Sequence, residues 1–456
     1  MSRFLPSLCT FLVRSRHRRD KYSDDIARQE RQTSSDLTVS EGAPVHSYLR
    51  DLGLLRDRRF ALLLSARTIS VLGSAFAPVA LAFGVLDMPG ADATTLSVVL
   101  TAESLPMIAF MLVGGVIADR LPRQRVMMVG ELIMALGYAA LAAMLLTGWS
   151  PLPALSVAAA ACGVATAITF PALTGIIPEV VPLERLQAGN ALLGLGANAS
   201  RVAGVVLSGG TVVVFGGGWA LVVSAAMFAL AGVLIALLRP TSGERAPAAK
   251  HSMLADLRDG WREFSSRQWI WVVVAQFSVL VMAIQAGHGV LGPLLAKETL
   301  GGPLAWSAFL GGEAVGTIVG VLVSLRVRPR RPILVGTLLC LPTALPYVLL
   351  GLDAPLWAIV AGAFVLGVCF DVFGVLWQTT MQREIPAESL SRVSSYDMLG
   401  SLMFGPIGLM LAGPAAHVFG TEGALLGCAV LVVLSTLAAL LSPGVRSLRA
   451  PEPVSH

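Results

Sequence analysis

Twelve apolar stretches follow one another along this chain, from Phe60 to about residue 442. They lie near 60–86, 94–118, 126–147, 152–177, 190–215, 219–238, 269–295, 304–325, 332–352, 355–379, 397–419 and 423–442. An α-helix rises about 1.5 Å per residue, so a stretch of about 20 residues is long enough to cross about 30 Å of hydrocarbon. The sequence therefore predicts an all-α membrane protein with twelve transmembrane helices.

The composition excludes a water-soluble fold of this length. Of the 456 residues, 55% are hydrophobic and only 13% are charged, whereas a soluble domain carries about 25% charged residues. Four of the five cysteines lie inside apolar stretches, namely Cys162, Cys340, Cys369 and Cys428. Their spacing matches neither a disulfide framework nor a metal site, so we expect small buried hydrophobic residues and predict no metal or cofactor.

The basic residues of the loops alternate from one loop to the next. Twelve of the 33 Lys and Arg residues precede the first apolar stretch, and others gather in every second loop after it. The opposite loops contain one basic residue, Lys297. Basic loops lie on the cytoplasmic side of membrane proteins, so we predict that both termini are cytoplasmic. The same pattern accounts for the net charge of +5 without a nucleic-acid partner.

A duplicated segment divides the chain into two halves. FPALTGIIPEVVPLERLQAGNALLG (170–194) resembles VLWQTTMQREIPAESLSRVSSYDMLG (375–400). Two six-helix halves related by duplication are a known transporter plan. The predicted parts are a disordered cytoplasmic tail (1–58), an N-terminal half (59–238), a cytoplasmic linker (239–268), a C-terminal half (269–442) and a cytoplasmic tail (443–456).

The linker contains one helical pattern. Leu254, Leu257, Trp261 and Phe264 follow one another at spacings of three, four and three residues. This spacing predicts an amphipathic helix. It lies either on the inner membrane surface or packed against protein, and the sequence leaves both alternatives open.

Charged residues gather at the end of the second apolar stretch, in GGVIADRLPRQRV (114–126). Gly115, Asp119, Arg120, Arg123 and Arg125 fill the pattern G-x-x-x-D-R-x-x-R-x-R. The pattern resembles the loop signature of the major facilitator superfamily, with a proline and a glutamine replacing its usual glycine and second basic residue. LPMIAFMLVGGVIADR and PEVVPLERLQAGNAL resemble its drug and siderophore exporter branch, which includes the enterobactin exporter and macrolide-efflux permeases. The resemblance covers about residues 50 to 442 and implies the major facilitator fold, but no particular substrate.

Asp119 needs a positive partner, because the C-terminus of a helix disfavours an anion. In the family, the matching acid contacts the start of the eleventh helix, here near Ser394 to Asp397. The resemblance therefore implies that the five motif residues form a conformational latch between the halves on the cytoplasmic side. The alternative is a plain positively charged anchor, which explains the arginines but not Asp119.

Six ionisable residues lie well inside the apolar stretches: Arg67, Glu103, Arg201, His288, Glu313 and Asp371. Each costs a few kcal/mol near the bilayer centre, so we expect them to face a cavity or one another. Arg201 and Glu313 both lie about 15 Å deep. The fifth and eighth helices face each other in the family, so the resemblance implies an Arg201–Glu313 pair. The small-residue face formed by Gly312, Gly316 and Gly320 would permit this close approach.

The buried charges suggest roles in transport. Asp371, Glu313 and Glu103 are candidate proton carriers, and the alternative for each is a permanently paired structural charge. Arg67 either holds an anionic group of a substrate or pairs with an acid. Like Arg201, His288 is a candidate for the substrate site or a charge pair, with a packed polar residue as the alternative.

The sequence favours secondary transport over catalysis. No G-x-x-x-x-G-K-[ST] occurs, and no arrangement of nucleophile and base suggests an enzyme. GLGANA (194–199) lies inside an apolar stretch without a preceding strand, so it indicates helix packing. We predict a monomeric proton-coupled exporter of a small amphipathic molecule in the bacterial cytoplasmic membrane. The alternatives are an importer of a small metabolite and a receptor or sensor built on the same fold.

Overall fold

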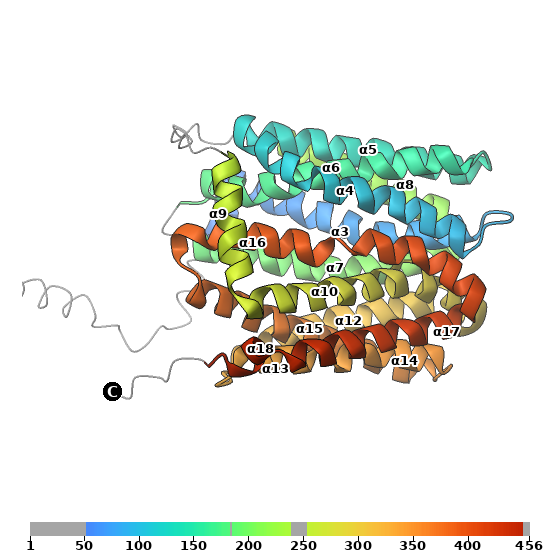
Figure 1. Ribbon diagram of the computed structural model, residues 1–456. Helices are drawn as coiled ribbons and strands as arrows, with labels where there is room; N and C mark the ends of the chain where they lie inside the picture. Colours follow the sequence, from blue (N-terminus) through green and yellow to red (C-terminus); the bar gives the residue numbers. More distant parts are fainter. Residues whose placement is uncertain (1–51, 183–184, 239–252, 450–456) are drawn as a thin grey trace, which may run out of the picture. The chain divides into compact units, whose positions relative to one another are not determined.

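The chain folds into α-helices, and no strand occurs in the residues that the structure describes, 52–182, 185–238 and 253–449. In this computed structural model, the helices from Arg58 onward belong to one compact unit, Leu55–His456. The long helices run side by side, and α9 crosses them at one end of the bundle (Figure 1).

The first half of the chain forms six long helices. These are α3 (Arg58–Leu86), α4 (Ala93–Arg120), α5 (Arg123–Thr147), α6 (Leu152–Val180), α7 (Leu186–Phe215) and α8 (Gly217–Leu237). The linker helix α9 (Met253–Ser266) follows. The second half contains α10 (Gln268–Ala286), α11 (Gly292–Leu295), α12 (Pro303–Ser324), α13 (Pro332–Leu339), α14 (Leu345–Gly351), α15 (Leu356–Glu384), α16 (Ala387–Leu402), α17 (Gly405–Leu441) and α18 (Pro443–Ser447).

The helices confirm the predicted membrane fold. Within the described residues, 11 helical segments are long and apolar enough to cross a membrane. The last, Arg392–Leu441, has 50 residues, which is enough for two crossings. It is interrupted at Gly420, whose φ of 74° is not helical. The twelve predicted stretches are therefore present, with the eleventh and twelfth joined at this glycine.

Prolines set the ends of several helices. α4, α6 and α15 end at Leu121, Val181 and Ile385, each of which has an extended backbone and precedes a proline. The proline ring disfavours the helical conformation in the residue before it. Val181 and Ile385 occupy matching places in the two duplicated segments, so the same local chemistry ends both helices.

The seventh and ninth crossings are irregular. Two π-helical turns, Gly287–Leu291 and Ala296–Leu300, flank α11 in the seventh crossing. Pro293 lies between them and has no N–H to donate, so the regular hydrogen-bond ladder cannot continue through it. In the ninth crossing, a 3-10 turn (Pro342–Ala344) separates α13 from α14.

Glycines let the main helix pairs approach closely. α4 packs against α6, and α12 packs against α15. A Cβ atom on Gly163 would lie 1.9 Å from the carbonyl oxygen of Glu103, and one on Gly316 would lie 2.2 Å from that of Phe364. Side chains at these positions would force the helices apart.

The face formed by Gly312, Gly316 and Gly320 lies against α15, so the prediction that it meets the fifth helix is wrong. Cβ atoms at these positions would meet the backbone of α15 at Val360, Phe364 and Val368. α7 does pack against α12, as predicted. A different glycine makes that contact, because a Cβ atom on Gly209 would lie 2.1 Å from the Ser307 Oγ.

The linker helix packs against protein along part of its length. Phe264 is buried, and its ring centroid lies 5.9 Å from that of Tyr396 in α16. The Trp261 ring lies 5.5 Å from Tyr396 but remains 55% exposed. The side chains of Leu254 and Leu257 lie outside the described residues. The two alternatives for this helix were contact with the membrane surface and packing against protein, and the buried Phe264 is packed against protein.

Four cysteines are free and buried, as predicted: Cys162, Cys340, Cys369 and Cys428. Each fills a place between helices, and a Cβ atom on Gly137 would lie 2.4 Å from the Cys162 Sγ. The segment predicted as a C-terminal tail begins with α18, where Val445 is buried in one cluster with Trp269 and Ile270.

Candidate functional site

The two halves meet at the end of the bundle where α3 ends and α4 begins, which we call the Asp92 end. The opposite end is the Arg123 end. Across the Asp92 end, the Gly413 N–H donates to the Ser97 Oγ at 2.9 Å. The His417 Nε2 lies 2.9 Å from the Asp92 Oδ2. The Lys297 Nζ lies 2.8 Å from the Asp87 Oδ1 and also donates to the carbonyl oxygen of Leu86.

Along α7, one face changes from buried to exposed with distance from the Asp92 end. Arg201, Val205 and Val212 lie on this face, because they are separated by four and seven residues. Val205 and Val212 are buried, whereas Arg201 is exposed. The face of α7 is therefore covered toward the Asp92 end and uncovered at Arg201.

In the first half, a carboxylate lies between polar and basic groups. Glu131 in α5 is buried, and its Oε1 accepts a hydrogen bond from the Ser70 Oγ at 2.7 Å. Arg67 lies one turn before Ser70 in α3 and interacts electrostatically with both Glu131 and Arg201. Glu131 was not predicted as a site residue. It is an ionisable residue inside the apolar stretch 126–147, and the other six candidates were chosen for that same property.

Glu103 lies inside the first half. The Tyr138 hydroxyl donates to its Oε1 at 3.1 Å, and the Tyr138 ring stacks on Phe228 at 5.4 Å. These contacts join α4, α5 and α8. This position favours the structural alternative for Glu103 over proton transfer between the halves.

In the second half, an ionisable cluster surrounds His288, which lies in the π-helical turn Gly287–Leu291. Its Nδ1 lies 3.8 Å from the Glu313 Oε2, and its Nε2 lies 3.3 Å from the hydroxyl of the fully buried Tyr347. The Phe309 and Trp306 rings lie 5.3 and 6.1 Å from the imidazole. The expected Arg201–Glu313 pair is absent among the described side chains, because His288 occupies that position beside Glu313.

Asp371 is half-buried in α15, near the Arg123 end. It packs beside Gly320, and its Oδ2 is buried without a hydrogen-bond partner among the described atoms. Asp397, which the sequence analysis named only as part of the expected latch contact, accepts a hydrogen bond from the Trp377 Nε1 at 3.0 Å. Glu313, Asp371 and Asp397 therefore lie on three different helices of the second half, α12, α15 and α16.

The loop motif is partly described. The Arg123 Nη1 lies 3.2 Å from the Glu179 Oε1, so it joins the start of α5 to the end of α6. Arg125 is exposed. The structure does not describe the surroundings of Gly115 or the side chains of Asp119 and Arg120. The contact expected for Asp119 therefore lies outside the described residues. Glu179 was not identified from the sequence, since an acid near a basic loop carries no distinct signal.

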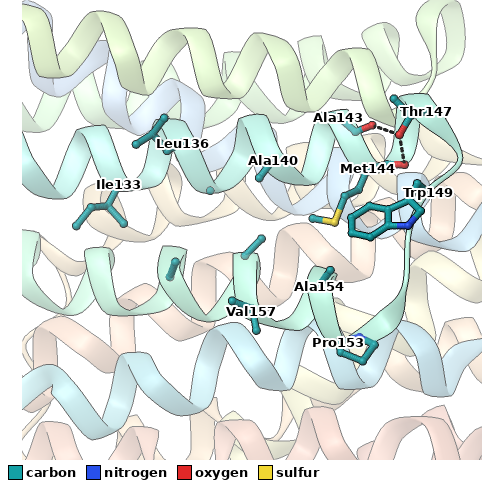
Figure 2. Close-up of a pocket in the computed structure, with 13 residues that line it drawn as sticks. Ile133, Leu136, Ala140, Ala143, Met144, Thr147, Trp149, Pro153, Ala154 and Val157 are labelled. Atoms are coloured by element: carbon teal, nitrogen blue, oxygen red, sulfur yellow. Dashed lines mark hydrogen bonds between the residues drawn. The ribbon is translucent and has the colours of Figure 1, made fainter.

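A groove of about 860 Å³ lies between α5 and α6, and its lining is almost entirely apolar (Figure 2). Leu136, Trp149 and Val157 line it and are 71%, 66% and 72% exposed. The ionisable residues described above take no part in its lining. Such an exposed apolar surface suits contact with lipid, so the charged clusters are the stronger candidate for the functional site.

Comparisons with known proteins agree with this architecture. Residues 60–404 match the family model of the Major Facilitator Superfamily. The chain is 25% identical over 406 residues to the multidrug efflux pump Tap of Mycolicibacterium fortuitum, covering 85% of this chain and 96% of that protein. It is 26% identical over 434 residues to the enterobactin exporter EntS of Citrobacter koseri, covering 90% and 98%.

Solved structures share the fold. The nucleoside transporter NupG gives a TM-score of 0.67 at 14% identity, covering 84% of this chain and 98% of that chain. A bacterial homologue of the human lysosomal transporter Spinster, in an inward-facing and unoccupied conformation, gives 0.65 at 16% identity, covering 85% and 97%. At these identities, the likeness concerns the fold alone.

Proposed function

The chain belongs to the Major Facilitator Superfamily, and we propose that it exports a small amphipathic molecule in exchange for protons. The similarity to a multidrug efflux pump and to a siderophore exporter supports the outward direction. We place the protein in the cytoplasmic membrane of a bacterium, as a monomer. The two halves rock about the substrate, so that the site is accessible from one side at a time.

The observation that carries this proposal is the arrangement of the two halves. They are joined at the Asp92 end by the Ser97, His417 and Lys297 contacts, and the face of α7 that is buried toward that end is exposed at Arg201. The loops at the Arg123 end are the basic ones, which supports a cytoplasmic position for that end. The structure then corresponds to the inward-facing state, which takes up substrate from the cytoplasm.

Glu313 and His288 form the best-supported site for the coupling proton. Their side chains are 25% and 14% exposed, so the pair is partly accessible without being fully solvated. The Glu313 Oε2 and the His288 Nδ1 lie 3.8 Å apart, and protonation of either group changes the local charge, which alters the cost of burying the pair when the halves move. Asp371, with an unpartnered oxygen, is the second candidate, and Glu103 is the third.

The loop motif serves as the cytoplasmic latch in this scheme. The Arg123–Glu179 ion pair ties together the two helices that flank the motif, which supports a fixed shape for the loop. In the outward-facing state, Asp119 would meet α16 near Ser394 to Asp397. Such a latch would form only in that state.

Proton coupling is tested by replacing the proposed carrier. Inside-out vesicles with an acidified interior should accumulate amphipathic fluorescent dyes, and a protonophore should abolish accumulation. Glu313→Gln should reduce gradient-driven accumulation by at least about tenfold, a factor that corresponds to about 1.4 kcal/mol. It should retain exchange of internal for external dye without a gradient, since exchange requires no net proton transfer.

Glu298→Gln is the matched control, because Glu298 is an exposed carboxylate on the same crossing as His288. It should behave like the wild type in both assays. Full gradient-driven accumulation by Glu313→Gln would move the proton site to Asp371 or Glu103. Accumulation that ignores the protonophore would contradict proton coupling itself, and accumulation in the opposite orientation would indicate an importer.

A further inference from the structure

Two arginines and one carboxylate lie near one another inside the first half, namely Arg67, Arg201 and Glu131. Arg67 and Arg201 lie on neighbouring helices, since a Cβ atom on Gly196 would lie 2.7 Å from the Thr68 Oγ1, and one on Gly204 would lie 2.9 Å from the Leu72 carbonyl oxygen. Residues 67–72 of α3 therefore run alongside residues 196–204 of α7. Two arginines thus share one region at about mid-membrane depth.

One carboxylate accounts for only one of these arginines. Glu131 is 2% exposed, and its Oε2 has no hydrogen-bond partner among the described atoms. The Ser70 hydroxyl fixes its other oxygen on the side of α3 that carries Arg67. Any negative charge on Glu131 offsets that of Arg67, because the two interact electrostatically and Glu131 has no second basic neighbour in the described part of the chain.

Arg201 is left with an unbalanced charge. No carboxylate lies within ion-pairing distance of it among the residues described, and the like-charged Arg67 interacts with it electrostatically. Its side chain is exposed on the face of α7 that is buried farther toward the Asp92 end. An uncompensated charge inside a membrane-spanning bundle is costly unless an anion or water reaches it from a cavity.

We propose that Arg201, backed by Arg67, binds an anionic oxygen group of the transported molecule, so that the substrate class is an amphipathic molecule with a carboxylate or similar acid. This inference rests on the proposed function and makes its substrate more specific. The guanidinium presents a planar fork of donors that matches two oxygens of one acid group.

Direct binding tests this assignment without any proton gradient. The purified full chain is titrated with dansylglycine, whose carboxylate is its only charge at neutral pH, and with the uncharged dansylglycinamide. The acid should bind saturably and at least about tenfold more tightly than the amide, as expected for charge-assisted hydrogen bonds worth about 1.5–3 kcal/mol. Arg201→Gln should remove this preference, and Arg201→Lys should keep part of it.

Arg326→Gln is the control, because Arg326 is an exposed arginine in the loop between α12 and α13. It should bind both probes like the wild type. Equal affinity for acid and amide, an unchanged preference in Arg201→Gln, or no saturable binding of dansylglycine would each overturn the assignment. Because binding requires no gradient, an acid-selective protein that fails in the vesicle assay would contradict the proposed coupling and leave this site standing.

Discussion

At the scale of single residues, the charges inside the bundle differ in how well they are satisfied. Glu103 has a tyrosine donor, Glu131 has Ser70 and Arg67 nearby, and Glu313 has His288. Arg201 has no such partner among the described residues. A buried charge that is paired contributes to the structure, whereas one that faces open space is available to a ligand.

Replacing Glu131 should therefore destabilise the protein. Glu131→Gln keeps an acceptor for Ser70 but removes the carboxylate that interacts electrostatically with Arg67. The melting temperature of the purified variant should fall, and the double variant with Arg67→Gln should recover most of the loss. A Glu131→Gln protein as stable as the wild type would show that the two side chains do not form a pair.

At the scale of helices, close packing depends on a few glycines. Gly316→Ala would place a methyl group 2.2 Å from the carbonyl oxygen of Phe364, so α12 and α15 would have to separate. We expect a lower melting temperature and less folded protein in the membrane. Gly374→Ala on α15 is the matched control, since a Cβ atom there meets nothing within 4 Å and alanine favours the helix by about 0.5–1 kcal/mol. Equal stability of the two variants would contradict the packing described here.

The sequence predicted helices well and their rotation poorly. Apolar length located the crossings, and the extended residues Leu121, Val181 and Ile385 that end three of the helices follow from the prolines after them. Depth in the membrane also follows from residue counts, which is why the buried ionisable residues were found. The Arg201–Glu313 pair failed because depth does not specify which way a side chain points about its helix axis. The π-helical turn that positions His288 could not be predicted, because the sequence around residues 287–291 has no pattern that distinguishes it from a regular α-helix.

At the scale of the whole molecule, the two halves are held at the Asp92 end by charged side chains near the surface. Partial burial opposes ionisation of Asp92, but hydrogen bonds from the Thr95 N–H, His417 and the Thr95 hydroxyl outweigh it and lower the pKa of Asp92 to about 2. A lowered carboxyl pKa stabilises the contact at every pH above the ordinary value of 3.8, and this contribution is lost as the pH falls toward about 2. Asp92 therefore stays ionised from mildly acidic to alkaline pH.

Asp92→Asn should loosen this contact at neutral pH, because it removes the charge that His417 meets. Spin labels at Pro89→Cys and Phe419→Cys, in a background without native cysteines, should report longer and broader distances in the variant. Asp353→Asn is the control, since Asp353 is exposed and has a φ of 50°, which asparagine also tolerates. Unchanged distances in Asp92→Asn would mean that the Lys297 and Ser97 contacts suffice to keep the halves together.

The break at Gly420 joins the last two crossings without any loop, within a single helix assignment from Gly405 to Leu441. The crossing that contains Gly413 and His417 is thus connected directly to the crossing that follows it, with no flexible loop between them. Any separation of the halves at the Asp92 end must pull on this second crossing as well. The tilt of a crossing depends on the thickness of the bilayer around it. We therefore expect the thickness of the surrounding bilayer to affect how easily the halves separate at the Asp92 end.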